Sequence, residues 1–90
     1  MAIVAQFAIP YFQFLNEQGK LNADAPAIAQ NPDTLKELYR MMVLTRTFDK
    51  KAIALQRTGK MGTYAPINGQ EALSTAIGHA MKKEDVFVPY

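Results

Sequence analysis

The sequence predicts a mainly helical chain that opens a larger layered fold of helices over a parallel sheet. Apolar residues recur at three- and four-residue steps over residues 33–57 and about 70–81, which predicts a long helix and a second, shorter one. A short apolar run at residues 86–90 is typical of the start of a buried strand. We therefore expect an extended arm and connector over residues 1–30, and the helical start of an incomplete domain over residues 31–90.

The composition is that of a folded protein. Of the 90 residues, 49% are hydrophobic and 20% are charged, which distinguishes the chain from disordered proteins. The net charge of +2 is small and scattered, so we expect no nucleic-acid surface. Cysteine is absent, which excludes disulfides and thiolate metal sites in this stretch. The apolar N-terminus lacks a basic segment and is interrupted by Pro10, so we expect no signal peptide, no membrane span and a cytoplasmic location.

The N-terminal arm combines apolar residues with turn signals. Residues 7–15 are rich in aromatic and branched side chains, and residues 16–20 end this run with Asn, Gln and Gly. The pattern predicts an extended segment followed by a turn, with Pro10 keeping the segment at a sheet edge or outside any sheet. Residues 21–30 have no sustained period and read as a connector.

The long helix has clear signals at both ends. Asn31 is a good N-cap, Pro32 suits the first helical position, and Gly59 allows the left-handed turn that ends a helix. The apolar stripe is wider than a single helix partner needs, so we expect it to be covered by another domain or subunit. The stripe comprises Leu35, Leu38, Met42, Thr45, Phe48, Ala52 and Leu55.

Two acid–base pairs on this helix are spaced three residues apart. Glu37 with Arg40, and Arg46 with Asp49, are expected to pair on the polar face, each stabilising the helix by about 0.2–0.5 kcal/mol. We expect no chemistry from them.

The second helix carries Glu71 in its first turn, where a carboxylate favours the positive end of the helix dipole. Small residues at every fourth position predict close approach of another backbone and hence a buried helix. These residues are Ala72, Ala76 and Ala80. The strand expected after this helix has no pairing partner in the sequence, so we expect the chain to be a piece of a longer protein.

Four ordered segments carry a resemblance to a known family. They are residues 38–52, residues 55–60, Tyr64-Ala65-Pro66 and Gly69-Gln70-Glu71-Ala72. With these segments the chain resembles the N-terminal part of the alpha subunit of thiamine-diphosphate-dependent 2-oxo acid dehydrogenases, and its arm and Tyr-Ala-Pro loop most resemble the pyruvate-specific members. Family members that act on branched-chain 2-oxo acids or acetoin remain alternatives.

The resemblance implies an α/β thiamine-diphosphate-binding fold and an enzyme that decarboxylates pyruvate and reductively acetylates lipoyl groups. It implies thiamine diphosphate and Mg²⁺ as cofactors, a beta subunit in a two-alpha, two-beta assembly, and a lipoyl-bearing acyltransferase as partner. Tyr90 is expected to neighbour the Tyr-Arg pair that holds the diphosphate in this family. The metal-binding segment of the family has no counterpart here, so we name no metal ligand and expect the 90 residues alone to bind no cofactor and to be inactive.

Three residues are candidates for the substrate pocket. Tyr64 offers an apolar ring and a hydroxyl that can donate to a carboxylate or carbonyl, but we favour the simpler role of packing on the Phe48 side of the long helix. Gln70 and Glu71 are candidates for orienting groups at the cofactor or subunit boundary, or they simply cap their own helix. We assign no catalytic residue, because the family takes its activating carboxylate from the beta subunit and His79 has no nucleophile or second ligand beside it.

A function from a different class stays open. The wide apolar stripe and the aromatic arm also suit a free-standing helical module that binds a protein partner.

Overall fold

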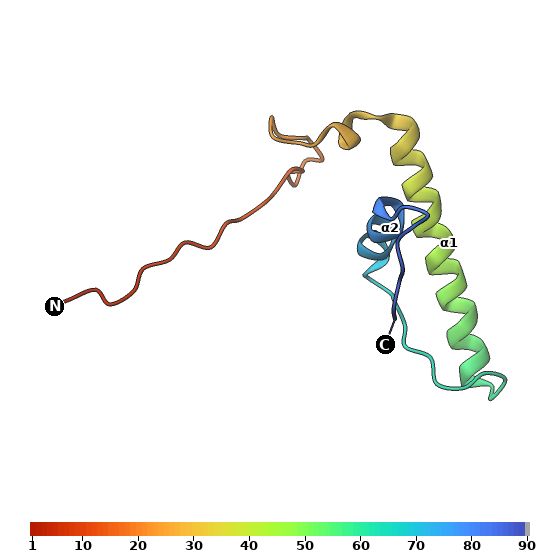
Figure 1. Ribbon diagram of the computed structural model, residues 1–90. Helices are drawn as coiled ribbons and strands as arrows, with labels where there is room; N and C mark the ends of the chain where they lie inside the picture. Colours follow the sequence, from red (N-terminus) through yellow and green to blue (C-terminus); the bar gives the residue numbers. More distant parts are fainter. Residues whose placement is uncertain (90) are drawn as a thin grey trace. The chain divides into compact units, whose positions relative to one another are not determined.

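The computed structural model describes residues 1–89 and divides the chain into two units. The first unit is Met1–Gln30 and the second begins at Asn31. The elements are a 3₁₀ turn η1 (Ala27–Gln30) and two helices, α1 (Pro32–Arg57) and α2 (Glu71–Ala80). Among the described residues there is no strand beyond one isolated bridge, so the prediction of a mainly helical chain is confirmed (Figure 1).

The first unit begins with a segment that has no helix or strand, followed by a tight turn. The side chain of Asn16 accepts hydrogen bonds from the backbone N–H of Gln18 at 3.0 Å and of Lys20 at 2.9 Å. The turn brings Leu15 and Leu21 into an antiparallel bridge. A side-chain amide capturing nearby backbone donors is how asparagine stabilises turns, so the predicted turn is confirmed.

Helix α1 begins where the sequence predicts. The Asn31 side chain accepts hydrogen bonds from the N–H groups of Asp33 at 3.2 Å and Thr34 at 3.3 Å, and Pro32 occupies the first position. This cap satisfies two of the four N–H groups that a helix start leaves without partners.

Helix α1 ends in a Schellman motif around Gly59, whose φ is +73°. Lys60 N–H donates to the carbonyl of Leu55 at 2.9 Å, and Gly59 N–H donates to that of Gln56 at 3.1 Å. Both bonds require the left-handed conformation that glycine adopts most easily.

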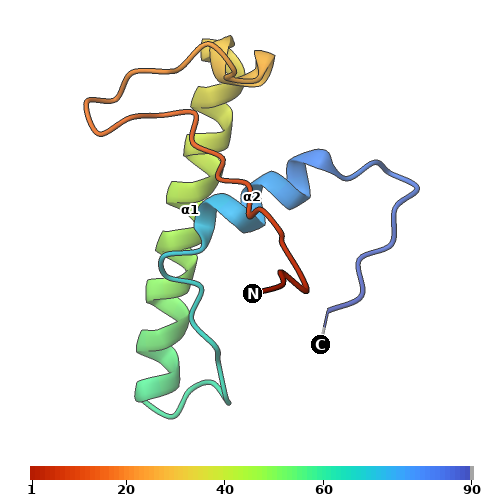
Figure 2. The same ribbon diagram turned by 90° about the vertical axis from the view of Figure 1, so that its left-hand side faces the viewer.

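After this turn the chain runs back along α1 and reaches α2, which packs on the middle of the long helix (Figures 1 and 2). Helix α2 begins after Gly69, whose φ is +92°, and its bounds lie within one residue of the predicted ones. The loop and the two helices therefore form a single α1–loop–α2 motif, in which α2 crosses α1 (Figure 2).

Two predictions about packing are wrong for the residues described. The alanine face of α2 is exposed, and Glu71 is the one buried residue of that helix. Residues 86–89 form no strand and lie exposed, because a strand needs a neighbour for its backbone hydrogen bonds and none of residues 1–89 supplies one. Tyr90, the last residue of that predicted strand, lies outside the described residues.

The acid–base pairs predicted on α1 are also wrong. Arg46 pairs with Glu71 of α2, Asp49 is buried under the loop, and Glu37 forms no ion pair with Arg40 within residues 1–89. Partners from another element offer more burial and better geometry than a surface neighbour three residues away.

The α1–loop–α2 motif has a very small apolar core. Ala52 is its only buried apolar residue among those described, whereas large side chains such as Tyr39, Leu44 and Phe48 on α1 are more than half exposed. No helix in the described part of the chain is long and apolar enough to cross a membrane.

Candidate functional site

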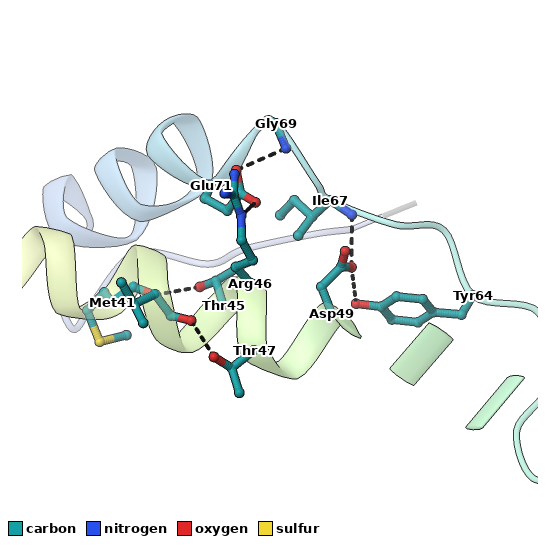
Figure 3. A network of polar contacts seen from close by, with 10 residues as sticks. Met41, Thr45, Arg46, Thr47, Asp49, Tyr64, Ile67, Gly69 and Glu71 are labelled. Carbon is teal, nitrogen blue, oxygen red and sulfur yellow. Dashed lines mark hydrogen bonds and ion pairs between the residues drawn. The ribbon is translucent and has the colours of Figure 1, made fainter. Parts of the chain in front are cut away.

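Two buried carboxylates join the loop and α2 to α1. Asp49 comes from the middle of α1 and Glu71 from the first turn of α2, and each is at most 3% exposed. Every buried side-chain polar atom among the described residues has a hydrogen-bond partner. Figure 3 shows Asp49 receiving its donors from the loop, and Glu71 receiving one donor from Arg46 of α1 and one from Gly69 just before α2. We refer to Asp49 and Glu71 as the carboxylate pair.

Asp49 binds the loop through one oxygen. Its Oδ1 accepts the Tyr64 hydroxyl at 2.8 Å and the Ile67 backbone N–H at 2.9 Å (Figure 3). The two donors lie three residues apart in a loop that has no helix or strand of its own. Asp49 therefore fixes the point along α1 at which the loop crosses it, and the direction in which the loop runs.

Glu71 binds both α1 and the start of its own helix. Its Oε1 accepts Arg46 Nε at 2.8 Å, and its Oε2 accepts the Gly69 N–H at 3.0 Å (Figure 3). These bonds hold the pKa of Glu71 at about 2, below its ordinary value of 4.5: the Arg46 hydrogen bond is the largest cause, backbone N–H groups add to it, and burial opposes it. The same bond raises the pKa of Arg46, whose side chain is about half exposed.

Tyr64 is held from two sides. Its hydroxyl donates to Asp49, which raises the pKa of the phenol, and burial acts in the same direction. Its ring meets Phe48 edge to face, with 6.5 Å between ring centroids and 60° between planes. Such edge contacts suit the quadrupoles of aromatic rings. The predicted packing of Tyr64 on the Phe48 side of the long helix is therefore confirmed.

Gln70 and Glu71 differ in their surroundings. Gln70 is exposed, and its side chain makes no capping hydrogen bond to α2. Glu71 does bond the Gly69 N–H just before its helix, so only one of the two residues performs the capping that the sequence suggested. The side-chain amide of Gln70 therefore stays available to other groups.

The predicted site residues do not line one common cavity. An open hollow of about 260 Å³ lies on the surface of α1 and is lined in part by Arg46, Lys50 and Glu71, but not by Tyr64 or Gln70. His79 is exposed in the last turn of α2. The predicted neighbour of the diphosphate, Tyr90, lies outside the described residues.

The sequence reading missed the site roles of Asp49 and Arg46. Asp49 follows Thr45 by four residues and precedes Ala52 by three, so it falls on the side of α1 that carries the apolar stripe. A carboxylate on that side needs buried hydrogen-bond donors. The position of Asp49 beside the apolar stripe was therefore the feature of the sequence that could have indicated its role. The donors themselves, a hydroxyl and a backbone N–H 15 and 18 residues away, carry no sequence pattern.

The described residues do not assemble a metal or diphosphate site. Within residues 1–89, no three His, Asp or Glu residues come together as a candidate metal centre. Both oxygens of Glu71, and the Asp49 oxygen that faces the loop, already accept hydrogen bonds from protein donors. We therefore assign none of these residues to a cofactor.

Comparison with known proteins identifies the family. The family described as "Dehydrogenase E1 component" matches residues 39–90. The chain is similar to proteins named "Pyruvate dehydrogenase E1 component subunit alpha": it is 46% identical over 78 residues to that of Bacillus subtilis (strain 168) and 44% identical over 88 residues to that of Bacillus cereus. The corresponding protein of Mycoplasma pneumoniae is 35% identical over 91 residues.

These matches cover 87%, 98% and 99% of the chain but only 21%, 23% and 25% of the relatives, so the chain spans about a quarter or less of their length. No solved structure gives a significant match. The family match takes in α1 from Tyr39 onward, the loop and α2, which are the elements that carry the carboxylate pair. The chain belongs to the dehydrogenase E1 component family.

Proposed function

We propose that this chain forms the N-terminal part of the alpha subunit of a pyruvate dehydrogenase. The observation that carries the proposal is the similarity, at 44–46% identity over 87–98% of the chain, to proteins bearing that name.

The proposed reaction of the intact enzyme is decarboxylation of pyruvate with reductive acetylation of a lipoyl group. Thiamine diphosphate, with Mg²⁺, would supply the electron sink, and the protein would supply binding and orientation. The proposed partners are a beta subunit, in a two-alpha, two-beta assembly, and a lipoyl-bearing acyltransferase. A cytoplasmic location stays a prediction, which fractionation of the source cells would test.

We propose different roles for the three candidate pocket residues. Tyr64 would present its ring to the substrate, because its hydroxyl proton is already donated to Asp49. Gln70, exposed and without a cap to make, would offer its amide to a group at the cofactor or subunit boundary. Glu71 would only hold the start of α2 in place on α1, since both of its oxygens are engaged by Arg46 and Gly69.

The test is an assay of the full reading frame that contains these residues, co-expressed with its beta partner. We expect carbon dioxide release from pyruvate that requires thiamine diphosphate and exceeds release from branched-chain 2-oxo acids. Preference for a branched-chain 2-oxo acid or for acetoin would replace the substrate but keep the family. No thiamine-dependent turnover of any of these compounds would overturn the proposed reaction.

The exposed apolar side chains favour a second candidate, a helical module that binds a protein partner. Tyr39, Leu44 and Phe48 on α1 and Leu73 on α2 are each 58–68% exposed, which is unusual for residues of this size. This candidate predicts that the natural gene product is a chain of about this length that sediments as a monomer and binds its partner through α1. A gene product several times longer, with the assay outcome expected above, would exclude it.

A further inference from the structure

We propose that Asp49 is a positioning residue for Tyr64: it anchors the loop over α1 and accepts the hydrogen bond of the Tyr64 hydroxyl, so that Tyr64 faces its ligand as a ring and a hydrogen-bond acceptor. The identity of the ligand as the substrate rests on the proposed function. The anchoring of the loop by Asp49 does not depend on that function. It revises the role that the sequence suggested for the hydroxyl, which was donation to a substrate carboxylate or carbonyl.

The loop has few polar anchors on α1 other than Asp49. Between Met61 and Pro66 the described chain makes no backbone–backbone hydrogen bond, and the glycines at 62 and 69 provide no side chain to pack. The two bonds to Asp49 Oδ1, from residues 64 and 67, are thus the polar contacts that hold this part of the loop on α1. Because Asp49 lies on a long regular helix, its position is well determined.

The Tyr64 hydroxyl has no donor left for a ligand. A phenol has one proton to donate, and an ionised carboxylate can only accept. The 2.8 Å bond between the Tyr64 hydroxyl and Asp49 therefore uses the single donor, and the Ile67 N–H on the same oxygen adds a further donor to the carboxylate. The phenol oxygen keeps only lone pairs for a ligand.

This hydrogen bond would determine what Tyr64 can bind. Lone pairs on Tyr64, with the negative charge of Asp49 directly behind them, would disfavour a substrate carboxylate at the hydroxyl. The ring, which is half-buried and meets Phe48 edge to face, instead offers an apolar wall. Tyr64 would thus contact the apolar side chain of a short 2-oxo acid, and the carboxylate of the substrate would be bound elsewhere.

The experiment uses the full-length subunit with its beta partner and three variants. Asp49→Asn keeps an acceptor at Oδ1, Asp49→Leu is similar in size but accepts nothing, and Tyr64→Phe keeps the ring and removes one bond. Glu37→Gln, an exposed acidic position on the same helix, is the matched control. The readouts are kcat and KM for pyruvate at saturating cofactor, the Tm, and amide hydrogen exchange of the peptide spanning residues 61–69.

We expect Asp49→Leu to lower kcat/KM by about tenfold or more, since a small misplacement of a positioning element has effects of this size. Exchange in residues 61–69 should accelerate in the same variant. Asp49→Asn should restore kcat/KM to within about threefold of wild type, because the acceptor geometry is kept. Tyr64→Phe should raise exchange while leaving KM within about twofold, because the hydroxyl gives the substrate no proton.

Several outcomes would overturn the inference. If Asp49→Leu has the kinetics and hydrogen exchange of wild type, Asp49 does not anchor the loop. If Asp49→Asn is as impaired as Asp49→Leu, the effect of Asp49 depends on its charge and not on its hydrogen-bond acceptor. A large rise of KM in Tyr64→Phe would restore the hydroxyl as a substrate donor.

The two proposals fail separately. If the wild-type enzyme does not turn over pyruvate, the proposed function fails while hydrogen exchange still decides whether Asp49 anchors the loop. If Asp49→Leu does not fold, Tyr64→Phe decides: exchange no faster than in wild type would overturn the proposed positioning of Tyr64 by Asp49.

Discussion

Arg46 and Glu71, 25 residues apart in sequence, form the one ion pair among the described residues, with 2.8 Å between Nε and Oε1. The pair is asymmetric, because the Glu71 side chain is 4% exposed whereas that of Arg46 is 52% exposed. A cation that remains partly in water keeps much of its hydration while it neutralises a buried carboxylate. The pair thus ties α2 to α1 with only one charge fully removed from solvent.

The depressed pKa of Glu71 predicts a specific acid sensitivity. A carboxyl whose pKa falls from 4.5 to about 2 on folding contributes stability that is fully present above pH 4.5 and is lost as the pH falls toward 2. We expect Glu71→Gln to lower the Tm near pH 7, and the difference from wild type to shrink between about pH 4.5 and pH 2. Calorimetry of both proteins across this range would measure it.

The control for this prediction is Glu37→Gln, which changes an exposed carboxylate on α1. Its Tm should stay close to that of wild type at each pH. A difference between Glu71→Gln and wild type that is constant from pH 7 to pH 2 would contradict the linkage.

The ion pair also predicts non-additive substitutions. Arg46→Met leaves Glu71 buried without its cation, and Glu71→Gln removes the charge that Arg46 neutralises, so each single change is expected to destabilise the protein. The double variant should be more stable than the sum of the two losses predicts, because no uncompensated carboxylate remains. Urea unfolding of the four proteins at low and high salt would give the coupling, which we expect to weaken with salt.

The N-cap of α1 predicts a moderate loss of stability. Asn31→Ala removes the acceptor for the N–H groups of Asp33 and Thr34 and should cost about 1 kcal/mol of unfolding free energy. Asn31→Asp keeps an acceptor at the same position and should retain most of the stability. Chemical denaturation of the three proteins measures this, and equal midpoints for Ala and Asn at residue 31 would show that the cap is dispensable.

Local signals predicted the helices because those signals are contained in short stretches of chain. Asn31 followed by Pro32, and Gly59 at the end of the periodic segment, each determine a helix end through bonds to residues at most five positions away. The physics of these ends is therefore readable from the sequence.

The site was only partly predictable because its bonds join distant elements. Asp49 and Arg46 are spaced as an ordinary surface pair, and only the folded loop reveals that each has a better partner in Tyr64 or Glu71. The predicted strand failed for a related reason: backbone groups at residues 86–89 need a neighbouring strand, which no local pattern can supply.

The end of α1 gives a prediction with a control in the same loop. Gly59 has φ +73° and its Cβ position is open, so Gly59→Ala meets no steric clash with neighbours and should cost only the backbone strain of a left-handed alanine, about 1 kcal/mol. Gly62 is equally open but has no positive φ, so Gly62→Ala should be neutral or slightly stabilising, by up to about 0.5 kcal/mol, through loss of unfolded-state entropy. Urea denaturation of the two variants isolates backbone conformation from packing. Equal stability of the two would mean that the Schellman turn contributes nothing to the end of α1.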